Sequence, residues 1–290
     1  MFELSILVPA AINGLTTGAI YALVALGLTL IYGVLHIINF AHGSLLMVAL
    51  YGVFFLHALV GIDPYLALLI VVPSGFAVGY ALQRGVIGKA SHGKDENILL
   101  VTLGLAIILD NLALFFWKAD TRSIDTVYAL ATLDLGVAIV PVTKAVALGG
   151  ALAIAGLLWL LMTRTDLGKA IRAVAKERQG ASLVGIDVSH VFAMSFGIGT
   201  AVVGAAACLL LPGFYVSPQV GSTFVLVAFT VVVLGGMGSF AGALIGGLII
   251  GVTESIGGLF LGESLGQIGI FVIFIAMLLL RPSGLLGHRA

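Results

Sequence analysis

The side chains best placed to do chemistry in this sequence are polar residues inside long apolar stretches. Asn13, Thr17 and Tyr21 follow one another at four-residue spacing, and Thr16 lies three residues after Asn13. This spacing places them on one face of a helix. A polar stripe on an apolar helix either lines a cavity that a small solute can enter or forms hydrogen bonds with a neighbouring helix. Both interpretations stay open at the level of sequence.

Two carboxylates also fall inside apolar stretches, Asp110 and Glu254. An acid near the middle of a bilayer costs roughly 2.5–3.5 kcal/mol on insertion scales, so such a residue normally faces protein or water. Each acid therefore lines a substrate path or gate, or lies near a helix end where interfacial water or a neighbouring helix satisfies it. Asp110 lies deeper in its expected span, whereas Glu254 lies close to an expected span end.

Residues 32–44 place His36, Asn39, His42 and Ser44 between two apolar runs. The hydrocarbon core offers no hydrogen-bond partners, so we expect these residues in a loop at the cytoplasmic surface or on the wall of a cavity. Two histidines six residues apart, with no clear common face, are a weak metal-ligand pattern. We therefore expect no metal and no other cofactor.

The sequence carries no pattern typical of an enzyme. It has no paired carboxylates, no His/Cys ligand cluster and no nucleophile–base arrangement at a shared depth. The glycine-rich stretch 234–242 lacks the lysine and the preceding strand of a phosphate-binding loop. Residues 85–90 do not match a Walker A motif either, because its first glycine is missing and Ala90 stands where the motif has serine or threonine. We expect instead a sharp turn or a close subunit contact at the glycine-rich stretch, formed by Gly235, Gly236, Gly238 and Gly242.

The composition defines the elements that must position these residues. Of 290 residues, only 9% are charged and 61% are hydrophobic, and there is one cysteine. An ordinary soluble protein carries roughly 25% charged residues. These values exclude a disulfide-built secreted protein and a disordered one, and the balance of 13 basic against 13 acidic residues argues against nucleic-acid binding. We expect an all-α polytopic transmembrane bundle that forms one domain over residues 1–290.

About eight or nine spans are expected, and some of them are broken or re-entrant. Residues 35–43 and 235–242 each join two apolar runs, which are two full spans or one broken element. Glycines at GxxxG spacing (Gly14 with Gly18, Gly242 with Gly246, Gly247 with Gly251) predict close helix contacts. The expected spans lie near 8–33, 41–60, 64–83, 97–117, 144–162, 189–211, 223–237, 240–256 and 266–280.

The basic residues predict the orientation. In this layout ten of the 13 lysines and arginines fall on one side, around residues 84–94, 164–178 and 281–289, and three fall on the other, between residues 118 and 144. The positive-inside rule assigns the ten to the cytoplasm. We therefore expect the N-terminus outside, the C-terminus in the cytoplasm, and a multi-pass protein of the plasma (inner) membrane.

The most informative polar segment is residues 163–188, which faces the cytoplasm in this layout. Its apolar residues recur at helical spacing from Leu167 to Ala175 and its basic residues form the opposite face, so it is an amphipathic helix. Asp166 is an N-cap or first-turn acid. Gly180 permits a break before a second short apolar piece, 181–186. The pair either rests on lipid head groups or docks a soluble cytoplasmic subunit.

Three stretches resemble the LivH-type permease subunits of branched-chain amino acid ABC importers. They are GLTLIYGVLHIINFAHGSLLM (27–47), TDLGKAIRAVAKERQGASLVGIDV (165–188), and VVVLGGMGSFAGALIGGLIIGVTES (231–255) together with LLLRPSGLLG (278–287). The resemblance covers essentially the whole chain in the family's order. Ser44 departs from it, because family members commonly carry an acid there.

The resemblance implies a non-catalytic translocation subunit of an ATP-driven importer. Its implied partners are cytoplasmic ABC ATPases, a second homologous permease subunit and an extracytoplasmic substrate-binding protein, within a lipid bilayer. The substrate is a branched-chain amino acid or a related small amino acid or amide. The alternative from a different class is a secondary transporter or channel that works alone.

The expected site residues fall into two groups. The resemblance implies ATPase coupling by Asp166, Gly168, Lys169, Arg172, Ala173, Lys176, Ala181 and Gly185. The candidate polar contacts of the translocation path are Asn13, Thr17, Tyr21, Asn39 and Asp110.

Overall fold

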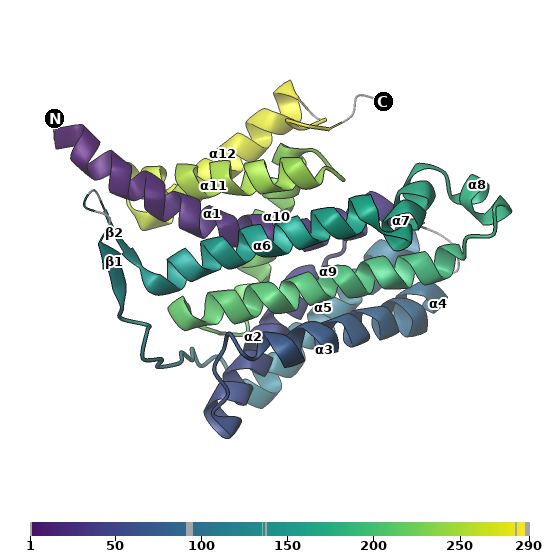
Figure 1. Cartoon of the computed structure of the whole chain (residues 1–290), viewed down its shortest axis with the longest axis horizontal. Coiled ribbons are helices and arrows are strands. Elements are labelled where there is room, and N and C mark those ends of the chain that lie inside the picture. The colour runs from purple at the N-terminus through teal and green to yellow at the C-terminus, as the bar shows by residue number, and fades with distance from the viewer. Residues whose placement is uncertain (1, 91–94, 135, 137, 282, 288–290) are drawn as a thin grey trace.

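The computed structural model describes residues 2–90, 95–134, 136, 138–281 and 283–287. In these ranges the chain is a bundle of apolar helices with one small antiparallel β-ribbon (Figure 1). Among the described residues, seven helices are long and apolar enough to cross a membrane, and two more apolar helices, 220–235 and 268–280, are shorter. The expectation of an all-α polytopic bundle is confirmed.

Nine apolar helices in the described ranges correspond one by one to the expected spans. They are α1 (Phe2–Leu35), α2 (Ala41–Val60), α3 (Leu68–Leu82), α5 (Asp95–Trp117), α6 (Val142–Arg164), α9 (Val188–Leu210), α10 (Val220–Gly235), α11 (Phe240–Leu261) and α12 (Glu263–Leu280).

Short elements connect these helices. A π-helical turn, η1 (Gln83–Ile87), and α4 (Gly88–Ala90) extend α3, and a 3₁₀ turn, η2 (Leu211–Gly213), follows α9. The strands β1 (Thr132–Asp134) and β2 (Ile139–Pro141) pair with Leu133 opposite Val140. The helices α7 (Asp166–Lys176) and α8 (Arg178–Leu183) lie at the opposite end of the bundle from this ribbon and from the start of α1 (Figure 1).

The helices α1 and α11 run side by side and form the most extensive helix pair in the bundle. Glycines make their close approach possible: a Cβ added to Gly18 would lie 2.6 Å from the carbonyl oxygen of Gly247, and one added to Gly14 would lie 2.5 Å from the Cα of Val252. In a membrane, packing of this kind drives helix association because lipid supplies no hydrophobic force between helices. The GxxxG expectation for this pair is confirmed.

The connection between α1 and α2 turns back into the bundle. His36 adopts a left-handed conformation, with φ 59°. The side chain of Asn39 then accepts a hydrogen bond from the amide of Ala41 at 3.1 Å. His42, in the first turn of α2, is fully buried, and its Nε2 lies 2.9 Å from the carbonyl oxygen of Val24. The helix α2 therefore begins beside the middle of α1.

This geometry corrects the expectation that the two histidines share a surface loop or a cavity. His36 is exposed, whereas His42 and Asn39 are buried among helices and line neither of the two cavities described below. The reason is close glycine packing: a Cβ on Gly221, in the first turn of α10, would lie 2.6 Å from the carbonyl oxygen of Gly43. That contact places the starts of α2 and α10 together inside the bundle.

The glycine-rich stretch forms a sharp turn between α10 and α11, as one of its two interpretations predicts. Gly236 and Gly238 have φ values of 104° and 86°, which favour glycine. The amide of Ser239 donates to the carbonyl of Gly236 at 2.9 Å, and the Ser239 side chain caps α11. Gly235 and Gly242 pack backbone to backbone across the turn.

Candidate translocation cavity and coupling surface

Two adjoining cavities lie around α1, toward the end of the bundle that carries the β-ribbon. The inner cavity has a volume of about 320 Å³ and the outer cavity about 850 Å³. Thr17, Tyr21 and Glu254 line both, so these three side chains form the boundary between them. A volume of several hundred Å³ is typical of sites that enclose a small molecule.

Hydrogen bonds position the polar side chains of these cavities. The Nζ of Lys144, in the first turn of α6, donates to Oδ1 of Asn13 at 2.5 Å. The Nδ2 of Asn13 approaches Oγ of Ser255 at 3.4 Å, and that hydroxyl donates to the carbonyl of Ala10 at 2.7 Å. The polar stripe of α1 is thereby joined to both α6 and α11.

Tyr21 and Glu254 meet at the boundary between the two cavities. The Tyr21 hydroxyl faces the Glu254 carboxyl, and Oε2 of that carboxyl is buried without a hydrogen-bond partner. The Tyr21 ring also meets Phe224 of α10 edge to face, with ring centroids 5.9 Å apart. Three helices thus contribute to one boundary between the inner and outer cavities.

Three of the five candidate path residues line these cavities. Asn13 lines the outer cavity, and Thr17 and Tyr21 line both. Asn39 and Asp110 line neither. Asp110 is half-buried on α5, which packs chiefly against α2 and lies away from α1.

Lys144 was missed as a site residue. Glu254, for which a path role and a span-end role were both open, was not among the five candidate path residues. Glu254 looked like a span-end residue because the expected span stops at 256, whereas α11 continues to Leu261. Lys144 looked like a loop cation because the expected span begins with it, whereas α6 begins at Val142. In both cases an error of a few residues at a helix boundary hid a cavity residue.

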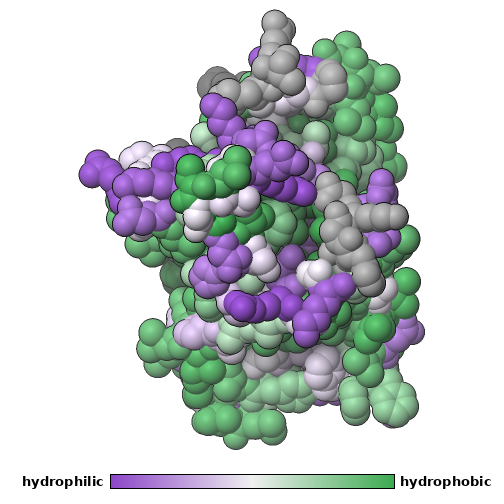
Figure 2. Space-filling view, turned by 90° about the vertical axis from the view of Figure 1, so that its right-hand side faces the viewer, coloured by the Kyte–Doolittle hydropathy of each residue, from purple (hydrophilic) through white to green (hydrophobic). Residues whose placement is uncertain are grey.

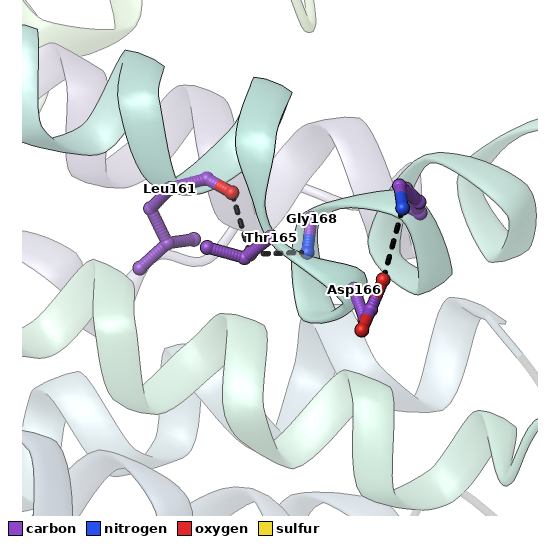
Figure 3. Close-up of polar contacts among 5 residues, drawn as sticks. Leu161, Thr165, Asp166 and Gly168 are labelled. Atoms are coloured by element: carbon purple, nitrogen blue, oxygen red, sulfur yellow. Dashed lines mark hydrogen bonds and ion pairs between the residues drawn. The ribbon is translucent and has the colours of Figure 1, made fainter.

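At the opposite end of the bundle, Thr165 fixes the angle between α6 and α7 (Figure 3). Its hydroxyl donates to the carbonyl of Leu161 at 2.6 Å and accepts from the amide of Gly168 at 3.0 Å. Thr165 is therefore the N-cap of α7, and Asp166 is the first-turn acid, 2.9 Å from Lys169. Gly168 allows the close approach, because a Cβ there would collide with the carbonyl of Leu161.

The expected amphipathic helix is confirmed, and its apolar face is already covered. Ile171 and Val174 are buried where α7 packs against α6, α9 and α1. Lys169, Arg172 and Lys176 are exposed. Other helices of the protein therefore cover the apolar face of α7, so lipid does not have to cover it. The basic face of α7 points away from the bundle.

The break between α7 and α8 lies at Glu177 and not at the expected Gly180. Glu177 has extended backbone angles, φ −155° and ψ 104°, and its side chain accepts from the amide of Gln179, so it caps α8. Gly180 lies inside α8. An N-cap residue has non-helical backbone angles, so α7 ends where the cap of α8 stands. The break therefore lies at Glu177 and not at Gly180.

The helix α8 presents apolar side chains outward. Leu183 and Val184, at its C-terminal end, are 86% and 76% exposed. Figure 2 shows this end of the molecule: hydrophilic residues gather over it, with a smaller hydrophobic patch among them. Of the expected coupling residues, Asp166, Lys169, Arg172, Lys176 and Gly185 are exposed, Ala173 is half-buried, and Gly168 and Ala181 are buried.

Fold and site together define a multi-pass membrane protein with a solute-sized cavity toward one end and a basic helical surface at the other. Residues 10–280 match the family described as branched-chain amino acid transport system / permease component. This chain belongs to that family of transport permeases.

Individual relatives agree with this family over nearly their whole length. The chain is 34% identical to the high-affinity branched-chain amino acid transport system permease protein BraD of Pseudomonas aeruginosa, over 96% of this chain and 94% of BraD. It is 32% identical to LivH of Escherichia coli K12, over 95% and 94% of the two chains. Among solved structures, PsaBC from Streptococcus pneumoniae in complex with Fab has a TM-score of 0.51 at 18% identity, over 93% of this chain and 91% of that one, a likeness of fold alone.

Proposed function

We propose that this chain is the translocation subunit of an ATP-driven importer that moves branched-chain amino acids into the cytoplasm. The chain itself does not hydrolyse ATP. Two cytoplasmic ATPases bind the α7–α8 surface, a homologous permease subunit completes the path, and an extracytoplasmic binding protein delivers the solute. The substrate follows from the printed names of the relatives, which are branched-chain amino acid permeases.

One observation supports this proposal most directly, namely the α7–α8 surface. Its apolar side packs on the bundle, while its basic side and the exposed Leu183 and Val184 face away from it. An apolar projection within a basic rim suits a groove on a soluble partner. A chain that transports alone has no use for such a surface.

The orientation that this proposal requires places α7 and α8 in the cytoplasm and the N-terminus outside. Of the basic residues in the described ranges, Arg84, Lys89 and Arg281 would then join the α7–α8 cations on the inner side. Single cysteines test it, because the native Cys208 is fully buried and gives little background labelling. We expect Ser123→Cys to react with an impermeant maleimide in intact cells and Ser182→Cys to react only after lysis. The reverse pattern would overturn the proposal.

Transport itself is tested with the purified complex in proteoliposomes. Uptake of radiolabelled L-leucine should require ATP, the ATPases and the binding protein together. The permease chain alone, given a proton or sodium gradient, should show no uptake above empty liposomes. Gradient-driven uptake by the chain alone would instead identify a secondary transporter.

A further inference from the structure

The inner cavity holds one cationic and one anionic side chain, from different helices. Lys144 comes from the first turn of α6 and Glu254 from α11, and both line the cavity. Within the described ranges the two form no ion pair with each other. Lys144 is instead held by Asn13, and one oxygen of Glu254 is buried with no partner.

A buried carboxylate oxygen without a partner is costly, unless a ligand supplies the missing donor. An ammonium group placed beside Glu254 would satisfy that oxygen, with the Tyr21 hydroxyl next to it. A carboxylate placed beside Lys144 would gain a charge-assisted hydrogen bond. It would also lie near the N-terminal end of the 23-residue α6, where the helix dipole favours an anion.

The remaining wall of the inner cavity is mostly apolar. It includes Ile20, Ala147, Leu209, Leu210, Phe224 and Val227. An apolar wall with two separated opposite charges suits a molecule that carries both charges at one end and a hydrocarbon chain at the other. An α-amino acid with an aliphatic side chain has this form.

We propose that Lys144 and Glu254 form a zwitterion subsite in which Lys144 binds the α-carboxylate and Glu254 the α-ammonium of an aliphatic amino acid. The inference rests on the proposed function, which it deepens by assigning the substrate's two charges to two side chains. It places two opposite charges in a cavity whose wall is otherwise mostly apolar. The permease chain then selects its substrate inside the membrane, in addition to the selection made by the binding protein.

The test measures binding to the complete permease–ATPase complex in lipid nanodiscs, without the binding protein. The probe is tritiated L-leucine, and the competitors each lack one charge. 4-Methylpentanoate keeps the carboxylate and the branched chain, and 3-methylbutylamine keeps the ammonium and the branched chain. We expect Glu254→Gln to weaken leucine binding by about tenfold or more while the affinity for 4-methylpentanoate changes by less than about twofold.

Lys144→Met should give the complementary pattern, with leucine binding weakened by about tenfold or more and the affinity for 3-methylbutylamine nearly unchanged. Lys118→Met and Asp125→Asn are the matched controls, because both residues are exposed and lie outside both cavities. They should bind all three ligands as the unchanged complex does.

Three results would overturn the subsite: unchanged leucine affinity in both variants, equal loss for all three ligands, or no saturable leucine binding by the unchanged complex. None of them refutes the proposed function, which is judged by ATP-dependent leucine uptake in the presence of the binding protein. Loss of that uptake in the unchanged complex would refute both proposals.

Discussion

The guanidinium of Arg178 donates a hydrogen bond to the backbone carbonyl of Leu35, with Nη2 and the oxygen 2.5 Å apart. Leu35 is the last residue of α1, and Arg178 is the first residue of α8. The same guanidinium lies 5.2 Å from the ring centroid of Phe192 on α9. One side chain thus joins the α7–α8 surface to the end of α1, directly before the chain turns back toward α2.

Arg178 should therefore transmit movement of the ATPases to α1. A hydrogen bond to a charged group contributes about 1.5–3 kcal/mol, so Arg178→Met should reduce ATP-driven uptake by roughly tenfold while the complex still assembles. Arg178→Lys keeps one charged donor and should recover part of the uptake. The measurement is leucine uptake alongside ATP hydrolysis in the same proteoliposomes. Hydrolysis that continues while uptake falls is the expected sign of uncoupling, and a parallel loss of both would contradict this role.

Arg172→Glu should weaken ATPase docking without affecting membrane insertion. Arg172 is exposed on the basic face of α7, so the bundle does not need it. Reversal of its charge places an acid within the basic rim of the α7–α8 surface and costs a charge-complementary interface more than neutralisation does. Copurification of the ATPases should fall several-fold, while the amount of chain in the membrane stays constant. Lys118→Glu, an exposed cation between α5 and β1, is the control and should copurify normally. Normal uptake by Arg172→Glu would contradict the docking role.

Leu183→Ser tests the apolar part of the same surface. Leu183 is 86% exposed, so its removal should leave the thermal stability of the isolated chain within about 0.5 kcal/mol. Binding of the ATPases should weaken by about tenfold, because a side chain that fills a partner pocket contributes more than 1 kcal/mol. Leu130→Ser is a matched control, since Leu130 is 94% exposed between α5 and β1. If both variants bind ATPases equally well, Leu183 is not part of the interface.

The sequence predicted the bundle because its strongest signals are local. Apolar runs, GxxxG pairs and the amphipathic spacing from Leu167 to Ala175 each need only neighbouring residues, and each corresponds to a helix or a helix contact in the structure. The polar stripe at Asn13, Thr17 and Tyr21 was predictable for the same reason, and all three residues line cavities.

The rest of the site depends on contacts between distant segments. The meeting of Tyr21 with Glu254 joins residues on α1 and α11, and that of Lys144 with Asn13 joins α6 to α1. No pattern within a single helix encodes either pair. The buried position of His42 likewise follows from the packing of Gly43 against Gly221, more than 170 residues away in the sequence.

Tyr128 and Asp63 tie together two connections at the β-ribbon end, and this contact should depend on pH. The Tyr128 hydroxyl donates to Oδ2 of Asp63 at 2.7 Å, and its ring stacks on Tyr65 with centroids 5.1 Å apart. Burial, followed by the charge of Asp63, raises the pKa of Tyr65 to about 12. Burial and the hydrogen bond to Asp63 also raise the pKa of Tyr128 above its usual value.

A raised tyrosine pKa means that folding favours the protonated form. The stabilisation is therefore complete below the ordinary tyrosine value of about 10 and is lost as pH rises through the folded values, near 12 for Tyr65. Hydrogen exchange around Asp63 and Tyr128 should be constant from pH 7 to about 9.5 after correction for intrinsic rates. Tyr128→Phe should lower the free energy of the local opening that permits exchange by about 1 kcal/mol at every pH, so exchange becomes faster. Exchange in that variant identical to the unchanged chain would show that the ring stacking alone holds these connections.

Gly18→Ala and Gly52→Ala should change stability in opposite directions. A Cβ at Gly18 would lie 2.6 Å from the carbonyl oxygen of Gly247 and 2.9 Å from the Cα of Leu248, and both are backbone atoms that cannot rotate away. The α1–α11 pair must then separate, at a cost of about 1–3 kcal/mol. Gly52 on α2 has nothing within 4 Å of the added Cβ, so alanine there should gain up to about 1 kcal/mol of helix propensity. Thermal unfolding in a mild detergent, followed by the reactivity of the buried Cys208 with a fluorescent maleimide, measures both. A stabilised Gly18→Ala variant would show that the α1–α11 contact is not set by these glycines.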